Sequence, residues 1–514
     1  MPKQKTDDLI QLIKSLTRAE KRHFRLFVRR NQTSDDILFL KLFDFLDRHK
    51  EYQEELILKR LPDIKKSQLS NLKAHLYKQL LVSLRLLNVH NTPDIQIREM
   101  IDYAKVLYDK GLYRQGLEVL EKAKEKALKG QFHIMALDIV EFEKHIEGQY
   151  ITRSIEGRAD ELTKQAEELR GHINKSDQFS NLAIQLYGLY LKVGYVRNQK
   201  EQHFISNFFH AQLPKIDYQE LDFQGKLNYC RAFSWYYHIS QDFPLSYKYA
   251  HKWVALFHEN DTYIDLYAPL YLKGLHNLLN ALFNTLQYDR FLAYLDELNR
   301  FGNKEDLLQN NNVEGLYYLF KYIHTIKKHY LEGTFTEGCK LIPELDSLIK
   351  EDRYNWDDHR IMLFYYRIAC LYFGSGDNEA AIDYLNLIIN QKNPDYRADI
   401  QCFARILNLI AHFELGNAQL VEYQIKSVFR FLLKMEELHA VQKEILRFLR
   451  RLPKTKAEDL KMEWINLKNK LAVHEADPFQ RRPFLYLDII SWLEAKIEQI
   501  PVQEVIRRKF LKRG

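Results

Sequence analysis

The sequence predicts an all-α protein, and three observations support this prediction. Only 18 Gly and 12 Pro are spread over 514 residues, so most of the chain must be helix rather than turn. No alternating run of Val, Ile or Thr is bounded by Asn-Gly or Asp-Gly, as hairpin strands would require. The apolar content of 46% is too high for a disordered chain. Because one core stops growing at roughly 250–300 residues, we expect several domains or an elongated repeat array.

Residues 365–394 predict a helix, a tight turn at Gly376 and a second helix. Apolar and small side chains fall on one face of each helix: Tyr365, Ile368, Ala369, Tyr372, Ala381, Leu385, Ile388 and Ile389. The small residues Ala369 and Ala381 lie where two helices must approach closely, and Pro394 closes the unit. These separations resemble a tetratricopeptide repeat of about 34 residues. The resemblance implies an α-solenoid of antiparallel helix pairs.

A second unit with this pattern lies at residues 100–127, with the turn at Gly111 and small residues at Ala104 and Gly116. Looser units turn near residues 241, 286, 333 and 416. From residue 241 onward, successive turns are 45, 47, 43 and 40 residues apart, which is longer than the tetratricopeptide period of about 34. We therefore expect longer helices or linkers and a less regular superhelix.

The N-terminal region predicts a separate module of five short helices, and Thr17 with Glu20 forms a capping box at the start of the second one. Three domains follow: a basic helical module (1–92), tetratricopeptide-like repeats (93–439) and a C-terminal helical cap with a basic, solvent-facing tail (440–514). Within the repeat domain, the irregular stretch after residue 132 is expected to break at Gly157, at Gly171 and at residues 175–177.

The net charge of +7 is concentrated at the two ends of the chain. Residues 1–95 hold 19 Lys and Arg against 12 Asp and Glu, and residues 506–514 hold five Lys and Arg with no acid. Helices at 54–61 and 67–87 are compatible with a helix-turn-helix that faces phosphate. Candidate polyanion contacts are Lys65, Lys66, Lys73, Lys78, Arg507, Arg508 and Lys509. Solvated basic faces, and a leucine stripe that packs on the repeats, are the alternative.

The sequence contains no phosphate-binding glycine loop, no GxGxxG, no HExxH and no GxSxG. Four scattered cysteines lack metal-ligand spacing. The Glu-x-x-His pairs at Glu20 and Glu436 lie among charged residues, which indicates exposed faces rather than a metal site. We therefore expect no catalysis, no cofactor and no metal. The start of the chain lacks a signal-peptide core and no apolar run spans a bilayer, so the prediction is a soluble cytoplasmic protein with no membrane partner.

The resemblance also implies a concave groove lined by the first helix of each pair, at positions 13, 10, 6 and 3 before the turn. Those positions give Arg98, Lys105, Tyr108, Asn228, Arg231, Trp235, His238, Lys273, His276, Asn280, Phe283, Phe320, Lys327, Tyr330, Tyr366, Cys370 and Phe373. Aromatic rings supply rigid contact area, and basic and amide groups fix polar ligands, although packing between repeats explains the aromatics equally well. The leading hypothesis is a non-catalytic scaffold that binds a protein or peptide. The alternative is a nucleic-acid-associated regulator with a basic N-terminal module.

Overall fold

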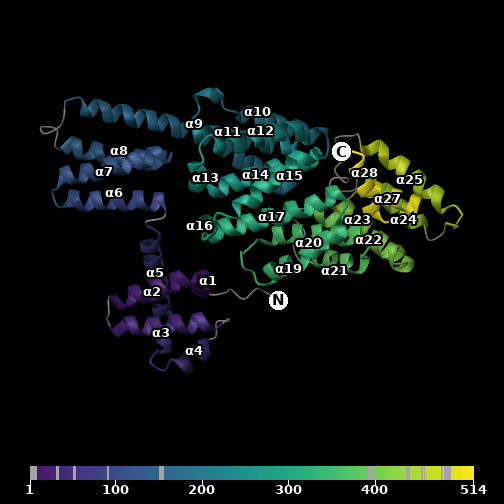
Figure 1. Cartoon of the computed structure of the whole chain (residues 1–514), viewed down its shortest axis with the longest axis horizontal. Coiled ribbons are helices and arrows are strands. Elements are labelled where there is room, and N and C mark those ends of the chain that lie inside the picture. Colours follow the sequence, from purple (N-terminus) through teal and green to yellow (C-terminus); the bar gives the residue numbers. More distant parts are fainter. Residues whose placement is uncertain are drawn as a thin grey trace. The chain divides into compact units, whose positions relative to one another are not determined.

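The computed structural model describes residues 8–30, 34–49, 54–89, 92–149, 156–391, 398–435, 440–452, 455–456, 458–475, 479 and 488–513. Every regular element in these ranges is a helix, which confirms the all-α prediction (Figure 1). None of the described helices is long and apolar enough to cross a membrane. The chain forms two compact units, Met1–Ile173 (unit 1) and Asn174–Gly514 (unit 2). The three sequence-based domains stay a prediction.

Unit 1 begins with five helices around their own apolar cluster, which includes Phe24, Leu42 and Leu76. Their bounds are α1 Asp8–Ser15, α2 Arg18–Arg30, α3 Ser34–Arg48, α4 Glu54–Arg60 and α5 Lys66–Asn88. The predicted capping box is confirmed: the Thr17 amide donates to the Glu20 carboxylate at 2.7 Å, and the Glu20 amide donates to Thr17 Oγ1 at 3.2 Å. Helix α5 packs on α1, α2 and α3.

The rest of unit 1 packs α6 Pro93–Asp109, α7 Tyr113–Lys129 and α8 His133–Gln149 around a second cluster. A Cβ atom added to Gly116 would lie 3.4 Å from the Ala104 carbonyl oxygen, so the two small residues do mark a close approach of helices. The predicted breaks at Gly171 and residues 175–177 are wrong. Helix α9 runs without interruption over Arg158–Val193, because helix-forming residues on both sides tolerate one internal glycine. The break at Gly157 is confirmed, with φ +80°.

Unit 2 packs helices largely in chain order, each against the ones that follow it (Figure 1). The bounds are α10 Gln199–Gln212, α11 Phe223–Ile239, α12 Phe243–His258, α13 Thr262–Leu266, α14 Ala268–Asn284, α15 Tyr288–Phe301, α16 Glu305–Leu308, α17 Asn311–Glu332, α18 Phe335–Gly338, α19 Ile342–Lys350, α20 Asp358–Ser375, α21 Asn378–Ile389, α22 Ala398–Glu414, α23 Ala418–Lys434, α24 Ala440–Arg451, α25 Leu460–Glu475, α27 Ile489–Glu498 and α28 Val502–Leu511. The predicted turns near 241, 286, 333, 376 and 416 all separate two helices.

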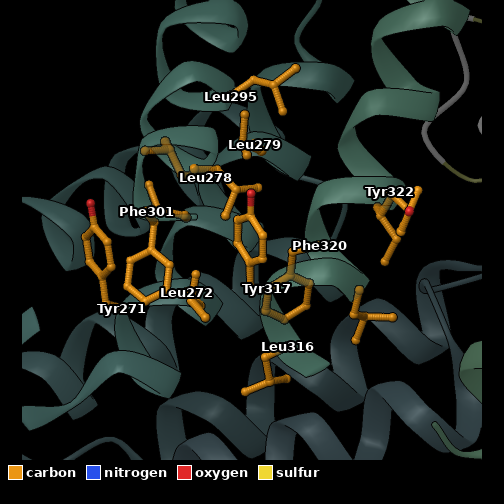
Figure 2. Packing of buried hydrophobic residues seen from close by; sticks show 14 of the residues in the cluster. Tyr271, Leu272, Leu278, Leu279, Leu295, Phe301, Leu316, Tyr317, Phe320 and Tyr322 are labelled. Atoms are coloured by element: carbon orange, nitrogen blue, oxygen red, sulfur yellow. The ribbon is translucent and has the colours of Figure 1, made fainter. Parts of the chain in front are cut away.

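Large side chains from neighbouring helices fill the core of unit 2. Figure 2 shows Leu272 and Leu279 of α14, Leu295 of α15, and Leu316 and Phe320 of α17 gathered in one cluster. An amphipathic helix gains most of its stability from packing such a face on its neighbours. Each of these helices therefore has one face of apolar residues buried in the core, and its other faces carry polar side chains.

The sequence predicted that the basic C-terminal segment is a solvent-facing tail, and this prediction is wrong. Helix α28 packs on α17 and α20, where Arg507 Nη1 donates to the Glu332 carbonyl at 3.3 Å and Thr336 Oγ1 donates to Gln503 Oε1 at 3.0 Å. Gly333 ends α17 with φ +70°, and a Cβ atom there would lie 2.5 Å from the Arg507 amide nitrogen. The glycine thus both turns the chain and lets α28 dock.

Replacing Gly333 by Ala is expected to destabilise unit 2 by about 1–3 kcal/mol more than replacing Gly376 by Ala. Both glycines have positive φ, where a side chain is strained, but a Cβ atom on Gly376 would meet nothing within 4 Å. The difference therefore isolates the contact with α28. Urea unfolding of the two variants measures it, and equal losses of stability would contradict the role assigned to Gly333.

Candidate functional site

A cavity of about 850 Å³ lies within unit 2. Its walls come from α9, α11, α14, α17 and α20, and α28 contributes Val502, Ile506 and Lys509 along one face. The volume falls in the range of about 300–1,000 Å³ that is usual for small-molecule and cofactor sites. The cavity is the feature on which the functional argument rests.

The cavity wall is strongly basic. Seven of its residues are Lys or Arg: Arg231, Lys273, Lys327, Arg360, Arg367, Lys509 and Arg513. Among the described wall residues Asp488 is the single carboxylate, and it accepts from the Ser491 amide at the start of α27, at 2.9 Å. The inner surface of unit 2 therefore carries a large positive excess.

Three of these cations form no ion pair with any carboxylate of the described chain. Arg231 donates to the Asn228 amide oxygen at 2.7 Å, and Lys327 donates to the Asn280 amide oxygen at 2.6 Å. Lys273 is exposed. Burial, and then the positive charges of Arg231 and Arg360, lower the pKa of Lys273. Burial lowers the pKa of Lys327 well below its usual range, and Arg367 lowers it further.

Unit 1 shows how the same chain treats a buried lysine that has a structural role. Lys124 is 4% exposed and lies 2.8 Å from Glu143 Oε2 and 2.8 Å from Glu121 Oε2. Arg158 adds a contact of 3.3 Å to Glu143. Buried charges are normally paired in this way, because an unpaired buried charge is costly. In the cavity, Lys273 is exposed and Arg231 and Lys327 are half-buried, so none of them needs an internal carboxylate as Lys124 does. All three remain available to an anion that enters from outside.

A chain of hydrogen bonds orients Lys327 in the cavity. Because Asn280 accepts from Lys327 through its oxygen, its amide nitrogen donates to His276 Nε2 at 3.0 Å. His276 then carries its proton on Nδ1 and donates to Nε2 of the fully buried His324 at 3.0 Å. The ammonium group also lies 4.4 Å from the centre of the Phe283 ring. The relay requires neutral imidazoles, and it holds Lys327 in one orientation.

Aromatic rings form another part of the wall. The ring of Trp235 lies 5.0 Å from that of Tyr187, 5.3 Å from that of Tyr190 and 5.7 Å from that of His238, measured between centroids. Burial raises the pKa of Tyr187, and the positive charge of Arg360 partly opposes this shift, so the two side chains are near each other. The aromatic group is thus adjacent to one of the cations.

Most of the predicted groove residues of unit 2 lie together around this cavity. They are Arg231, Trp235, His238, Lys273, His276, Asn280, Phe283, Phe320, Lys327, Tyr330, Tyr366, Cys370 and Phe373. Asn228 is not in the wall; it is buried, donates to Ser176 Oγ at 3.0 Å and orients Arg231. Their role in binding stays a prediction.

The three predicted groove residues of unit 1 do not line the cavity. Arg98 is exposed on α6. Lys105 pairs with Asp109 at 2.7 Å, and Tyr108 Oη donates to Gln149 Oε1 at 2.5 Å. These contacts are local to unit 1.

Sequence reasoning missed the tyrosines of α9 and the arginines of α20, and it did not place α28 beside the groove. The spacing rule stopped at 13 residues before the turn, whereas Arg360 lies 16 residues before Gly376, one helical turn earlier. A spacing rule that reached one helical turn further back from the turn residue would have included Arg360. Tyr187 and Tyr190 carried no comparable signal, because α9 lies outside the matched pairs. Lys509 was predicted as a polyanion contact of the C-terminal tail and not as part of the groove.

The predicted polyanion contacts are divided between the two ends. Lys65, Lys66 and Lys78 are exposed, and Lys73 is half-buried. Lys509 lies 2.6 Å from Glu494 Oε2, and Arg508 lies 3.1 Å from Glu504 and 3.3 Å from Glu498. Three of the four N-terminal lysines are thus open to solvent, whereas Arg508 and Lys509 already pair within unit 2. Nucleic-acid binding stays a prediction.

In the described part of the chain, no group of three or more His, Cys, Asp or Glu residues could hold a metal ion. The four cysteines are free thiols. Glu436 and its partner His439 lie outside the described residues. Comparisons with protein-family models, with curated proteins and with solved structures found no match. The cavity must therefore be interpreted from its own chemistry.

Replacing Lys327 by Met is expected to raise the free energy of unfolding of the ligand-free protein by about 1–3 kcal/mol, because a half-buried cation without a counter-charge is removed. Lys328→Met is the matched control, since Lys328 is the next residue and lies on the more exposed side of α17. Urea unfolding compares the two variants. A loss of stability in Lys327→Met would show that the lysine has a structural partner.

The relay also predicts a dependence of stability on pH. Burial lowers the pKa of His276 and His324 well below its usual value, and neighbouring cations lower it further. Both rings stay neutral in the folded chain, while the unfolded chain gains protons below about pH 6.5. Stability is therefore fully present above that pH and is lost as the pH falls.

The test is urea unfolding at pH 7, 6 and 5. Each histidine contributes at most about 1.4 kcal/mol per pH unit. In His324→Gln the new side chain keeps an acceptor for His276 but does not titrate, so the slope should be smaller by up to that amount. An unchanged slope would contradict the assignment of neutral histidines.

Proposed function

We propose that this chain is a non-catalytic binding protein that holds an anionic ligand inside unit 2. The proposal includes the architecture that the sequence suggests, a tetratricopeptide-like array of helix pairs whose first helices face inward. A scaffold for a protein or peptide partner is one form of this function, in which the anion is an acidic segment of the partner.

The observation that carries the proposal is the set of unpaired cations that face a cavity of ligand size. Arg231, Lys273 and Lys327 come from α11, α14 and α17, so three separate helices each place one cation on the same wall. Arg231 and Lys327 are half-buried, and a partly desolvated charge without a counter-charge destabilises a fold; sites kept for function commonly carry such a cost. An anion that enters the cavity would remove it.

Binding rather than catalysis is favoured by what surrounds the cations. Burial raises the pKa of Cys370 to about 12, so its thiol is not an activated nucleophile. The cations have fixed partners such as Asn228 and Asn280, which hold them in place without moving protons at the ligand. These are features of a recognition surface.

Sulfate tests the proposal without choosing a ligand class, because its charge and oxygens resemble both phosphate and paired carboxylates. A few millimolar sodium sulfate should raise the melting temperature of the full chain above that in sodium chloride of equal ionic strength. The double variant Arg231→Gln/Lys273→Gln should lose most of this increase, by the linkage between binding and stability.

Lys328→Met again serves as the control, because general salt effects act on it as on the unmodified protein. An equal response to sulfate in all three proteins would show that the cavity holds no anion, and the proposal would fail.

A further inference from the structure

Five cations line the cavity from four helices: Arg231 on α11, Lys273 on α14, Lys327 on α17, and Arg360 and Arg367 on α20. Arg231 and Arg360 lower the pKa of Lys273, and Arg367 lowers that of Lys327, which defines two groups of cations. Arg360 also lies 3.3 Å from Asp357 Oδ2. A carboxylate carries one charge, which a single arginine matches through two hydrogen bonds. A phosphate group carries close to two negative charges and three acceptor oxygens. Several cations in one group therefore match phosphate better than an acidic peptide.

An aromatic platform lies beside the first of these groups. Trp235 is one turn along α11 from Arg231, and Tyr187 is near Arg360. Trp235 is half-buried and forms part of the wall, so part of its surface is open to a ligand. Aromatic side chains of this kind stack on nucleobases with little regard for the base. A polyphosphate chain has no ring that could stack on these aromatic side chains, so they favour a ligand that also carries a base.

We propose that the cavity of unit 2 is a nucleotide site, with the phosphates on Arg231, Lys273 and Arg360 and the base against Trp235 and Tyr187. The wall of the site includes no glycine-rich loop, whose backbone amides would donate hydrogen bonds to the phosphates. The cationic side chains would donate these hydrogen bonds instead. The inference rests on the proposed function and narrows it, because it names the chemical class of the anion.

Lys327 is the second anchor for phosphate, and the relay behind it makes His276 and Asn280 positioning residues. Asn280 accepts from the ammonium group at 2.6 Å, and His276 holds the Asn280 amide. Neither needs to touch the ligand. Asn280→Asp would place a carboxylate on Lys327 and should weaken binding by neutralising the lysine, whereas Asn280→Gln should be better tolerated.

Isothermal titration calorimetry on the full chain tests the inference with five probes: ATP, GTP, sodium pyrophosphate, adenosine and hexaglutamate. ATP or GTP should bind more tightly than pyrophosphate, and adenosine and hexaglutamate should bind more weakly than either nucleotide. Arg231→Gln and Lys327→Met should each lower nucleotide affinity about tenfold or more, since charge-assisted hydrogen bonds are lost. Lys328→Met should leave affinity unchanged.

Trp235→Leu separates the base from the phosphates. It should weaken ATP or GTP about tenfold while pyrophosphate binds as before. Quenching of tryptophan fluorescence by the nucleotide in the unmodified chain gives a second measurement, which does not depend on how this variant folds. Equal losses for nucleotide and pyrophosphate, together with no quenching, would overturn the placement of the base.

The outcomes distinguish this inference from the function on which it rests. If hexaglutamate binds and neither nucleotide nor pyrophosphate does, the nucleotide site is wrong but an anion-binding protein remains. If no probe binds and sulfate leaves the melting temperature unchanged, both are wrong. If pyrophosphate binds more tightly than ATP and GTP, the proposed nucleotide site is wrong and the ligand is a polyphosphate.

Discussion

Unit 2 depends on the constraint that a helix can bury only part of its circumference against its neighbours. Helices α11, α14, α17 and α20 each pack an apolar stripe on other helices, and another stripe of each faces the cavity. Helix α17 illustrates the two kinds of stripe. Leu316 packs only in the apolar core, whereas Phe320 packs in the core and also borders the cavity. The side chains on the inward stripes decide what the cavity can hold.

The inward stripes carry positive charge that the fold neutralises only in part, since Lys509 pairs with Glu494 and Arg360 with Asp357 while Arg231, Lys273 and Lys327 have no carboxylate partner in the described chain. In unit 1 the buried Lys124 has two carboxylates within 2.8 Å, whereas Lys327 has an amide oxygen and the face of Phe283. An amide dipole orients an ammonium group, but it does not offset the free energy needed to bury the charge. Repulsion among Arg231, Lys273 and Arg360 adds to this instability. A bound anion would offset both the desolvation of Lys327 and the repulsion among the three cations. Ligand affinity and folding stability are therefore linked through the same side chains.

The C-terminal helix joins the cavity to the end of the chain. Val502, Ile506 and Lys509 recur every three or four residues, so one face of α28 meets the cavity wall while Lys509 also pairs with Glu494. Lys468 lies on the same carboxylate at 2.7 Å. These contacts lower the pKa of Glu494 although burial opposes the shift. The carboxylate therefore stays charged and anchors α28 from mildly acidic pH upward, and this anchor weakens only as the pH falls toward the pKa of Glu494.

The sequence by itself determined the helices and the turns between them, because these follow from local signals. The capping pair Thr17 and Glu20 begins a helix in any context, and Gly376 ends one because it accepts positive φ. Helical spacing before the turns also placed Arg231, Lys273 and Lys327 on inward stripes. The error at Gly171 has the same origin, since a lone glycine is a weak break inside a long helix.

Only the tertiary structure decided that these stripes enclose a cavity, and which charges there lack partners. Tyr187 of α9 and Lys509 of α28 are more than 300 residues apart in the chain, and both line the cavity. No local pattern records that proximity. Pairing of charges is likewise a property of three-dimensional distance: the sequence shows 76 basic and 69 acidic residues, but not that the cavity wall holds seven of the basic residues and, among the described residues, one carboxylate. The site arises from this separation of charge, because attraction between opposite charges depends on where the fold places them.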